Sequence, residues 1–295
     1  MRLLPVYSTL ILLLLFPGCA SSRKDRVVVG CKNFTEQLIL GEIIAQQLEA
    51  KTHLEVDRRF YLAGTFIAHQ AVVGGRVDIY PEYTGTSLTA VLKQAPRGDR
   101  QQVYDAVRNG YLQKFHLDLG PPFGFNDTFA IEIRGADARQ LSLKTISQAA
   151  AYTPKWRAGF GYEFMERPDG YKGLVQAYGL RFAEDPRIMD LGLLTRALKD
   201  RQVDLIAGNT TDGLIPALDL FVLEDDRHYF PPYEAVPVIR KETLDLHPEI
   251  GLALKELAGC ISDAEMEALN YSVDGQHRDV EVVAREFLQK KGLVR

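Results

Sequence analysis

The sequence has few of the residues from which metal centres and disulfide frameworks are built. Its 295 residues include three cysteines and six histidines, and no pair of them has the spacing of a zinc site. A P-loop and a nucleophile elbow are both missing, and Gly159 and Gly161 lack the third glycine of a dinucleotide-binding loop. The residues therefore offer no catalytic constellation, and we expect no enzymatic activity, no metal and no cofactor.

Basic stretches are missing as well. The chain carries 35 Lys and Arg against 39 Asp and Glu, a formal net charge of −4, without the Lys/Arg-rich stripe that is typical of nucleic-acid binding. Hydrophobic residues make up 46% of the chain and charged residues 25%, as in ordinary globular proteins with one large domain or two small ones. We therefore expect a globular protein without a nucleic-acid partner.

The N-terminus has the pattern of a secretory signal peptide. Arg2 precedes an apolar run from Leu10 to Phe16, which is shorter than the roughly 20 residues that span a bilayer. Apolar runs of membrane length are missing from the rest of the sequence too. We predict a signal peptide over residues 1–18 and a mature protein outside the cytoplasm; a short buried helix is the alternative.

Gly18 and Cys19 at the end of this run resemble a bacterial lipobox, in which the cysteine is acylated and becomes the new N-terminus. Phe16 and Pro17 depart from the residues usual at their positions, and an unlipidated secreted protein is the alternative. Because two or three acyl chains anchor a protein stably where one does not, lipidation at Cys19 implies a membrane-anchored protein. Residues 19–26 then form a short polar tether.

Two further cysteines, Cys31 and Cys260, belong to the mature chain. In an oxidising compartment they could pair, but nothing in the sequence shows that they approach each other. Two small, partly buried thiols are the simpler interpretation.

From Arg26 onward, strand-like and helix-like segments alternate. Short β-branched or alternating runs predict strands, and helical spacing of apolar residues predicts the helices between them. The predicted strands are 27–29, 54–60, 77–80, 129–133, 157–160, 203–207 and 236–240, and the predicted helices are 36–50, 65–73, 99–115, 142–151, 170–178 and 193–199, with three more before the C-terminus. Repeated βα units indicate an α/β fold with parallel sheets covered by helices.

Two breaks divide this pattern, one near Asn126 and one at residues 230–232. The simplest architecture is two α/β lobes joined by two crossovers. The first lobe is discontinuous and takes up residues 27–126 plus 232–295, and the second takes up residues 127–231. Two lobes joined in this way form a cleft that can close by hinge motion.

Several segments combine aromatics, amides and small turn residues in a way that a plain core does not require. The stretches that carry a family resemblance are KNFTEQ at 32–37, DIYPEYTGT at 78–86, TDGLI at 211–215 and LEDDRHYFPPYEAVPVIR at 223–240. In this order they resemble the osmoprotectant-type substrate-binding proteins of ABC importers, which bind glycine betaine, carnitine, choline and related compounds. The resemblance runs from Val27 to the C-terminal helices. It implies a two-lobed periplasmic-binding-protein fold of type II with two interlobe crossovers.

The resemblance also implies a quaternary ammonium ligand, ABC permease subunits as partners and a monomeric receptor. A trimethylammonium group cannot donate an N–H hydrogen bond, and aromatic faces suit it, at roughly 1–2 kcal/mol per desolvated contact. By the same resemblance the site residues are Tyr83, Phe129, Asn209 and Tyr233 for an aromatic cage, and Gln37 and Thr86 for the carboxylate of the ligand.

Two cage positions depart from the family pattern. Phe129 replaces a common tyrosine but keeps an aromatic face, whereas Asn209 has none, so the cage is three-sided or another residue closes it. Thr86 favours a ligand with a carboxylate, because choline-preferring relatives tend to have an acidic residue there. The structural alternatives are interlobe packing for the tyrosines, core for Phe129, a surface amide for Gln37, a helix cap for Thr86 and a turn for Asn209.

Glycine betaine is the default ligand, because it is the commonest in the family. The space and the amide at Asn209 also favour a bulkier betaine such as ergothioneine, and choline or carnitine are further alternatives. Two other classes of function stay open. One is an extracytoplasmic enzyme acting on a cationic metabolite, and the other is a sensor that docks on a membrane partner other than a permease.

Overall fold

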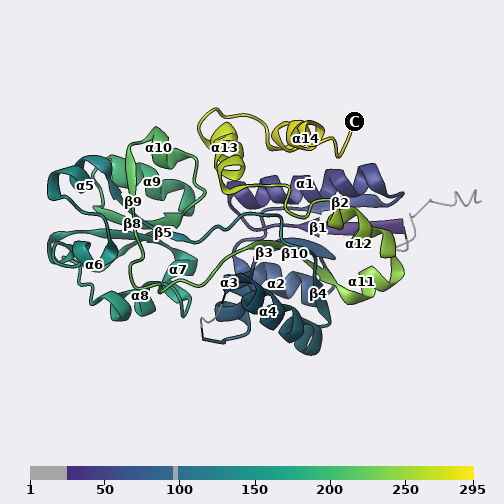
Figure 1. Ribbon diagram of the computed structural model, residues 1–295, viewed down its shortest axis with the longest axis horizontal. Coiled ribbons are helices and arrows are strands. Elements are labelled where there is room, and N and C mark those ends of the chain that lie inside the picture. Colours follow the sequence, from purple (N-terminus) through teal and green to yellow (C-terminus); the bar gives the residue numbers. More distant parts are fainter. Residues whose placement is uncertain (1–24, 96–98) are drawn as a thin grey trace, which may run out of the picture.

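The computed structural model describes residues 25–95 and 99–295. The predicted signal peptide, residues 1–18, and Cys19 lie outside the described residues. Strand β1 (Arg26–Gly30) begins at the last residue of the predicted tether. None of the helices in the described ranges has the length and hydropathy of a membrane span. The chain forms two lobes, each with a five-stranded sheet and helices around it (Figure 1).

The first lobe is built on a sheet with the strand order β2-β1-β3-β10-β4. Its other strands are β2 (Glu55–Arg59), β3 (Ile79–Tyr83), β4 (Leu117–Leu119) and β10 (Ala235–Arg240). β1 pairs in parallel with β2 and β3, as predicted. The prediction of parallel strands is wrong for β10, which runs antiparallel to β3 and β4 because the chain enters it directly from the other lobe.

Helices cover both faces of this sheet. They are α1 (Thr35–Lys51), α2 (Thr65–Val73), α3 (Thr84–Thr86), α4 (Arg100–Phe115), α11 (Lys241–Leu246), α12 (Pro248–Lys255), α13 (Asp263–Asp274) and α14 (Val280–Lys290), with a π-helical turn at Ser87–Val91. Val27 and Val29 of β1 pack with α1 and the C-terminal helices, whereas Val28 packs on the α2 and α4 side. Residues 241–295, all described, hold four helices where three were predicted.

Helix α1 is buried on its polar side as well as on its apolar side. Glu42, Gln46 and Gln47 are polar residues of this helix, yet all three are buried. Gln46 Nε2 donates to Glu42 Oε2 at 3.1 Å and to the Glu281 carbonyl at 3.0 Å. Gln47 Nε2 donates to the Ala253 carbonyl at 3.1 Å. The C-terminal helices therefore supply hydrogen-bond partners that let a helix of mixed polarity lie inside the lobe.

The second lobe has the strand order β7-β6-β8-β5-β9. Its elements are strands β5 (Phe129–Arg134), β6 (Ala158–Gly161), β7 (Arg187–Met189), β8 (Leu205–Asn209) and β9 (Leu220–Leu223), helices α5 (Gly135–Leu141), α6 (Ile146–Ala149), α7 (Tyr162–Glu166), α8 (Tyr171–Tyr178), α9 (Leu191–Lys199) and α10 (Leu214–Ala217), and a 3₁₀ turn at Thr153–Lys155. β6 is parallel to β7 and β8, but β5 is antiparallel to β8 and β9. The helix predicted over 142–151 is shorter, because a capping box of Thr145 and Gln148 starts α6 at Ile146.

The two segments that connect the lobes lie side by side (Figure 1). Asn126 and Glu234 form an isolated antiparallel bridge, and Asn126 Oδ1 accepts a hydrogen bond from the Tyr233 N–H at 2.7 Å. The Asp127 N–H donates to the Tyr233 carbonyl at 3.1 Å. Because the crossovers are bonded to each other, they form a single narrow connection between two separately packed lobes.

The cysteines of the described chain are unpaired. Cys31 is buried, and burial raises the pKa of its thiol to about 12. Cys260 is half-buried, and its Sγ donates to the Glu256 carbonyl at 3.1 Å. The structure therefore agrees with the interpretation of two separate thiols.

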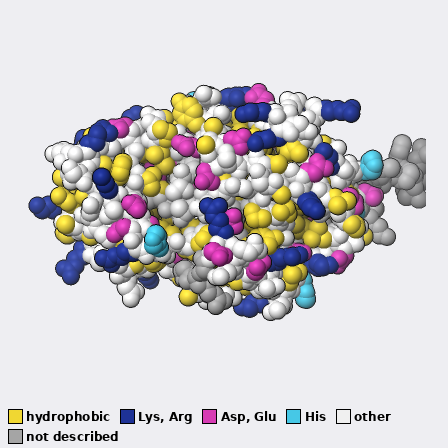
Figure 2. All heavy atoms as spheres, in the orientation of Figure 1, with side chains coloured by type: hydrophobic (Ala, Val, Ile, Leu, Met, Phe, Trp, Pro, Cys, Tyr) yellow, Lys and Arg dark blue, Asp and Glu magenta, His cyan; other side chains and the backbone are white. Residues whose placement is uncertain are grey.

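Surface charge is mixed. On the face shown in Figure 2, Lys and Arg side chains are interspersed with Asp and Glu side chains over both lobes. Arg139 with Asp219 and Arg285 with Glu281 are examples of the exposed ion pairs. Such pairs are screened by solvent and contribute little to stability.

Glu132 is a buried carboxyl group in β5, an interior strand of the second sheet. Its side chain is 0% exposed, and neither carboxyl oxygen has a hydrogen-bond partner among the described residues. Burial raises the pKa of this carboxyl well above its usual range, and the charges of Asp212 and Asp127 raise it further. Folding therefore favours the protonated form. The protonated Glu132 carboxyl is compatible with the folded state at low pH. As the pH rises through the raised pKa, the free energy of unfolding decreases, because the buried carboxyl then has to lose its proton.

We expect Glu132→Met to stabilise the fold by about 1–3 kcal/mol near pH 8, because a side chain of similar length removes the buried acid. At about pH 4.5 the difference should shrink, since the wild-type carboxyl then holds its proton. Urea unfolding at both pH values measures the two differences, and the exposed Glu166→Met is the control. A Glu132→Met protein less stable than wild type near pH 8 would contradict the prediction.

Candidate ligand-binding site

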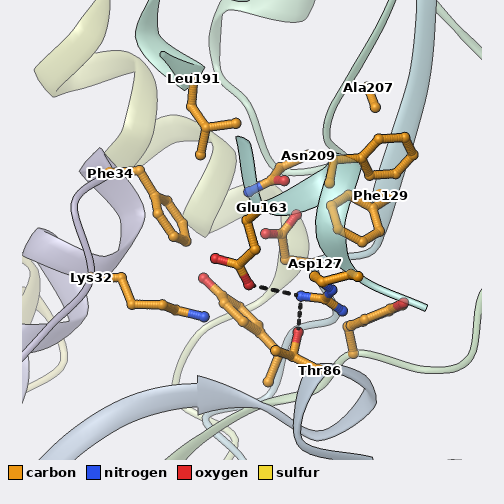
Figure 3. Close-up of a pocket in the computed structure, with 13 residues that line it drawn as sticks. Lys32, Phe34, Thr86, Asp127, Phe129, Glu163, Leu191, Ala207 and Asn209 are labelled. Atoms are coloured by element: carbon orange, nitrogen blue, oxygen red, sulfur yellow. Dashed lines mark hydrogen bonds and ion pairs between the residues drawn. The ribbon is translucent and has the colours of Figure 1, made fainter. Parts of the chain in front are cut away.

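A cavity of about 60 Å³ lies between the lobes, where β3 and β8 end and β5 begins (Figure 3). Five of the six predicted site residues line this cavity, namely Tyr83, Thr86, Phe129, Asn209 and Tyr233. The sixth, Gln37, is not among the lining residues. Its side chain is fully buried, and its Oε1 accepts from the Lys32 N–H at 3.3 Å. Gln37 therefore supports the segment that carries Lys32.

Local backbone structure positions Tyr83 and Thr86. Tyr83 is the last residue of β3, and Thr86 ends the short helix α3 that follows. Gly85 lies between them, and a Cβ there would come within 2.6 Å of the Tyr233 ring and 2.7 Å of the Pro232 carbonyl. A glycine at this position lets the second crossover pack closely against the end of β3, which brings Tyr233 into the site.

Aromatic rings form two sides of the cavity (Figure 3). Phe129 and Tyr233 meet edge to face, with ring centroids 5.8 Å apart and an interplanar angle of 72°. On the other side Phe34 stacks with Tyr83 at 6.4 Å and 18°. The sequence prediction missed Phe34, although it lies within the stretch KNFTEQ. Phe34 provides an aromatic face in addition to the three that were predicted.

Two buried cations accompany these rings. Lys32 Nζ lies 2.6 Å from Glu82 Oε1 and 4.9 Å from the centroid of the Tyr83 ring. The guanidinium carbon of Arg167 lies 4.9 Å from the centroid of the Phe129 ring. Both side chains line the cavity. The site therefore combines positive charge with aromatic faces, a pairing that the sequence prediction did not contain.

Arg167 joins the second lobe to the first. Its Nη1 donates to Thr86 Oγ1 at 2.9 Å, and its Nε and Nη2 donate to the two Asp169 oxygens at 2.9 and 2.6 Å. Burial lowers the pKa of Arg167, but the hydrogen bonds and charge of Asp169 outweigh burial, so its pKa is raised. Because Thr86 accepts from Arg167, its own hydroxyl proton is free to donate to a ligand.

Two buried acids lie beside the rings. Glu36 Oε1 accepts from the Tyr83 hydroxyl at 2.7 Å. Glu36 Oε2 accepts from the Thr211 hydroxyl and, at 3.0 Å, from Asn270. Burial raises the pKa of Glu36, and burial together with the charge of Glu36 raises the pKa of Asp127 well above its usual range. The bond from Tyr83 to Glu36 holds the tyrosine ring in place, and the bond from Thr211 is a second link between the lobes.

The arrangement suits a ligand with charges of both signs. The rings can contact a diffuse cation, and Lys32, Arg167 and Thr86 can bind an anion within the same cavity. Over residues 25–95 and 99–295, no cluster of three or more His, Cys, Asp or Glu side chains is placed to hold a metal ion.

Known proteins with similar sequences and structures have two-lobed folds of this kind. The family model for the substrate binding domain of ABC-type glycine betaine transport systems matches residues 25–290. The carnitine transport binding protein of Listeria monocytogenes is 37% identical over 276 residues, 93% of this chain and 89% of that protein. The ergothioneine transport permease/ergothioneine binding protein of Helicobacter pylori is 35% identical over 280 residues, 95% of this chain and 50% of that protein. A crystal structure of a glycine betaine/carnitine/choline ABC transporter has a TM-score of 0.75 and 35% identity, over 90% of this chain and 99% of that chain.

Proposed function

The chain belongs to the family of substrate-binding domains of ABC-type glycine betaine transport systems, and we propose that it captures a betaine-like solute for such an importer. The observation that carries this proposal is the interlobe cavity in which aromatic faces and buried cations lie side by side. A betaine carries a trimethylammonium group and a carboxylate a few bonds apart, so it presents both groups that such a cavity binds. Glycine betaine is the simplest solute of this class and is the reference ligand for the tests.

In this proposal the trimethylammonium group lies against Tyr83, Phe129 and Tyr233. Phe34 adds a fourth aromatic face, which replaces part of the wall that Asn209 does not provide. Each desolvated contact between a cation and a ring contributes roughly 1–2 kcal/mol. Three such contacts and a satisfied carboxylate are enough for a Kd near about 1 µM, which corresponds to about −8 kcal/mol.

The carboxylate of the ligand lies among Lys32, Arg167 and Thr86 in the same proposal. Hydrogen bonds between a guanidinium or an ammonium and a carboxylate are stronger than neutral ones, and both cations are already buried at the cavity. Gln37, which the sequence assigned to the carboxylate, supports the backbone of Lys32 in this proposal by accepting a hydrogen bond from its N–H.

We also propose that residues 27–126 plus 232–295 move as one lobe and residues 127–231 as the other, about the paired crossovers. Besides the bond from Arg167 to Thr86, Glu163 Oε2 accepts from the Thr65 N–H at 3.0 Å across the lobes. Such bonds hold the lobes together around the cavity, and entry of a ligand requires them to open.

Substrate-binding proteins of ABC importers work outside the cytoplasm and deliver their ligands to permease subunits. We propose that this chain does so as a monomer held to the cell membrane by a lipid on Cys19, with residues 1–18 removed. We expect a Cys19→Ala variant to be lost from membrane fractions, because it has no site for the lipid. If the variant stays in the membrane fraction as wild type does, the protein is attached by other means.

A thermal-shift screen tests the proposed function. The protein without its signal peptide is heated with glycine betaine, carnitine, proline betaine, ergothioneine and choline. A ligand at 100 times its Kd stabilises the native state by about 2.7 kcal/mol, so a clear rise in Tm is expected for betaines that carry a carboxylate. Absence of a shift with every compound would contradict the proposal. The protein should also return its ligand unchanged after long incubation, whereas turnover would favour the enzyme alternative.

A further inference from the structure

A second, larger cavity adjoins the cavity of the cage. It measures about 330 Å³, and we call it the outer chamber. Phe34, Leu191 and Asn209 line both spaces, so these three residues mark the passage between them. Figure 3 shows Asn209 between Leu191 and Phe129. The wall that Asn209 leaves out of the aromatic cage is therefore the side on which the outer chamber lies.

The charge of the outer chamber is opposite to that of the carboxylate-binding part of the cage. Glu36, Asp190, Asp212 and Asp274 line the outer chamber, and the described residues around it include no Lys, Arg or His. The cage cavity, in contrast, is lined by charges of both signs, with Lys32 and Arg167 beside Asp127 and Glu163. A ligand that spans both spaces therefore finds cationic partners only at its cage end.

Several acceptors in the chamber have hydrogen-bonding capacity to spare. Asp212 Oδ1 accepts from the Leu214 N–H at 2.8 Å, and Asp274 Oδ1 accepts from the Thr35 hydroxyl at 2.6 Å. Within the described part of the chain, the second oxygen of each carboxylate has no hydrogen bond. Asn270 also lines the chamber, and its buried Oδ1 has no partner there. Groups that can only accept require a ligand that donates.

Glu132 adds a further polar group beneath the chamber. Its buried, unpartnered carboxyl lies directly against Gly208, which lines the chamber. A Cβ at position 208 would collide with Glu132 Oε1, so a glycine there leaves room for this carboxyl behind the chamber wall. Keeping an acid buried without a partner costs stability, and such costs are typical of functional sites.

We propose that the outer chamber is a second subsite for a side arm of the ligand. On this proposal, which rests on the proposed function, the substrate is a trimethylammonium carboxylate whose carbon chain bears an arm ending in N–H or O–H donors. The carboxylate lies at Arg167, the methyl groups at the rings, and the arm passes Asn209 to reach Asp212 and its neighbours. Acidic arms are excluded by the chamber's carboxylates.

Isothermal titration calorimetry of the purified protein tests this inference with two probes. Glycine betaine has no arm, whereas ergothioneine is a betaine whose ring carries N–H donors. The wild-type protein should bind ergothioneine at least about tenfold more tightly than glycine betaine. Asn209→Tyr should close the passage and add an aromatic face. It should therefore weaken ergothioneine about tenfold or more and strengthen glycine betaine, reversing the preference.

A second variant keeps the test decisive if Asn209→Tyr disturbs the fold. Asp212→Asn should lower the ratio of ergothioneine affinity to glycine betaine affinity about fivefold or more, whereas the exposed Asp200→Asn should leave the ratio as it is. Glycine betaine binding without any preference for ergothioneine, or equal losses for both probes in the variants, overturns the second subsite while the proposed function stands. Failure of both probes to bind the folded wild-type protein overturns both.

Discussion

Arg167→Met is expected to weaken glycine betaine binding about 100-fold. The variant removes the guanidinium that lies between Thr86 and the Phe129 ring, where we place the ligand carboxylate. Hydrogen bonds to charged groups contribute roughly 1.5–3 kcal/mol, and 100-fold is about 2.7 kcal/mol. Choline has no carboxylate, so its affinity should fall much less. Calorimetric titration of both ligands measures the difference.

Arg167 forms a buried ion pair with Asp169, so a variant of Arg167 also affects Asp169. Asp169 is 3% exposed, and removing its partner leaves an uncompensated charge that destabilises the fold. The double variant Arg167→Met/Asp169→Asn removes both charges and is the better protein for titration. Arg157→Met, at an ion pair with Asp204 away from the cavity, is the control for loss of an arginine. Equal losses for glycine betaine and choline in the double variant would show that Arg167 does not serve the carboxylate.

Phe129→Leu is expected to weaken the binding of every quaternary ammonium ligand about tenfold. Leucine keeps the apolar volume but has no aromatic face, and one contact between a cation and a ring contributes roughly 1–2 kcal/mol. The Arg167 guanidinium also loses the ring against which it lies. Phe129→Tyr restores the face and should retain most of the affinity. The same titration with glycine betaine and choline measures both variants.

Phe129 is a better test than Tyr83 for a structural reason. Tyr83 is 4% exposed and its hydroxyl donates to Glu36, so Tyr83→Ala would disturb the fold as well as the cage. Truncation there creates a cavity and removes a partner of a buried acid, and it lowers the free energy of unfolding by about 3–5 kcal/mol. Phe182→Leu, whose ring packs with Phe160 in the second lobe, is the control for loss of a phenylalanine. Wild-type affinity in a folded Phe129→Leu protein would mean that the cage lies elsewhere.

The class of fold followed from local patterns, while the direction of two strands did not. β1, α1 and α2 were predicted close to their observed bounds, because β-branched runs and helical spacing depend on neighbours a few residues away. β5 and β10 each follow a crossover between lobes, and both pair antiparallel with strands that were predicted to be parallel. The direction of a strand depends on the side from which the chain enters the sheet, and the periodicity of the sequence contains no information about that side.

The candidate site divides in the same way. Tyr83, Thr86, Phe129, Asn209 and Tyr233 came from the family resemblance, and the structure brings all five to one cavity. Lys32 and Phe34 lay within a recognised stretch but were not selected, because nothing in that stretch tells which side chains face the cavity. Arg167 lies in a stretch without a motif, and it meets Thr86 across 81 residues of chain.

The sequence by itself determined the family, the two lobes with their crossovers, and three of the aromatic residues that line the cavity, because each is recorded in short runs of residues. Only the tertiary structure decided which charges meet in the cleft. Arg167 reaches Thr86 and Glu36 reaches Asn270, 234 residues away, through the packing of separate elements. The strength of such contacts depends on burial and on the partner across the lobe boundary. Neither can be read from the neighbours of a residue along the chain.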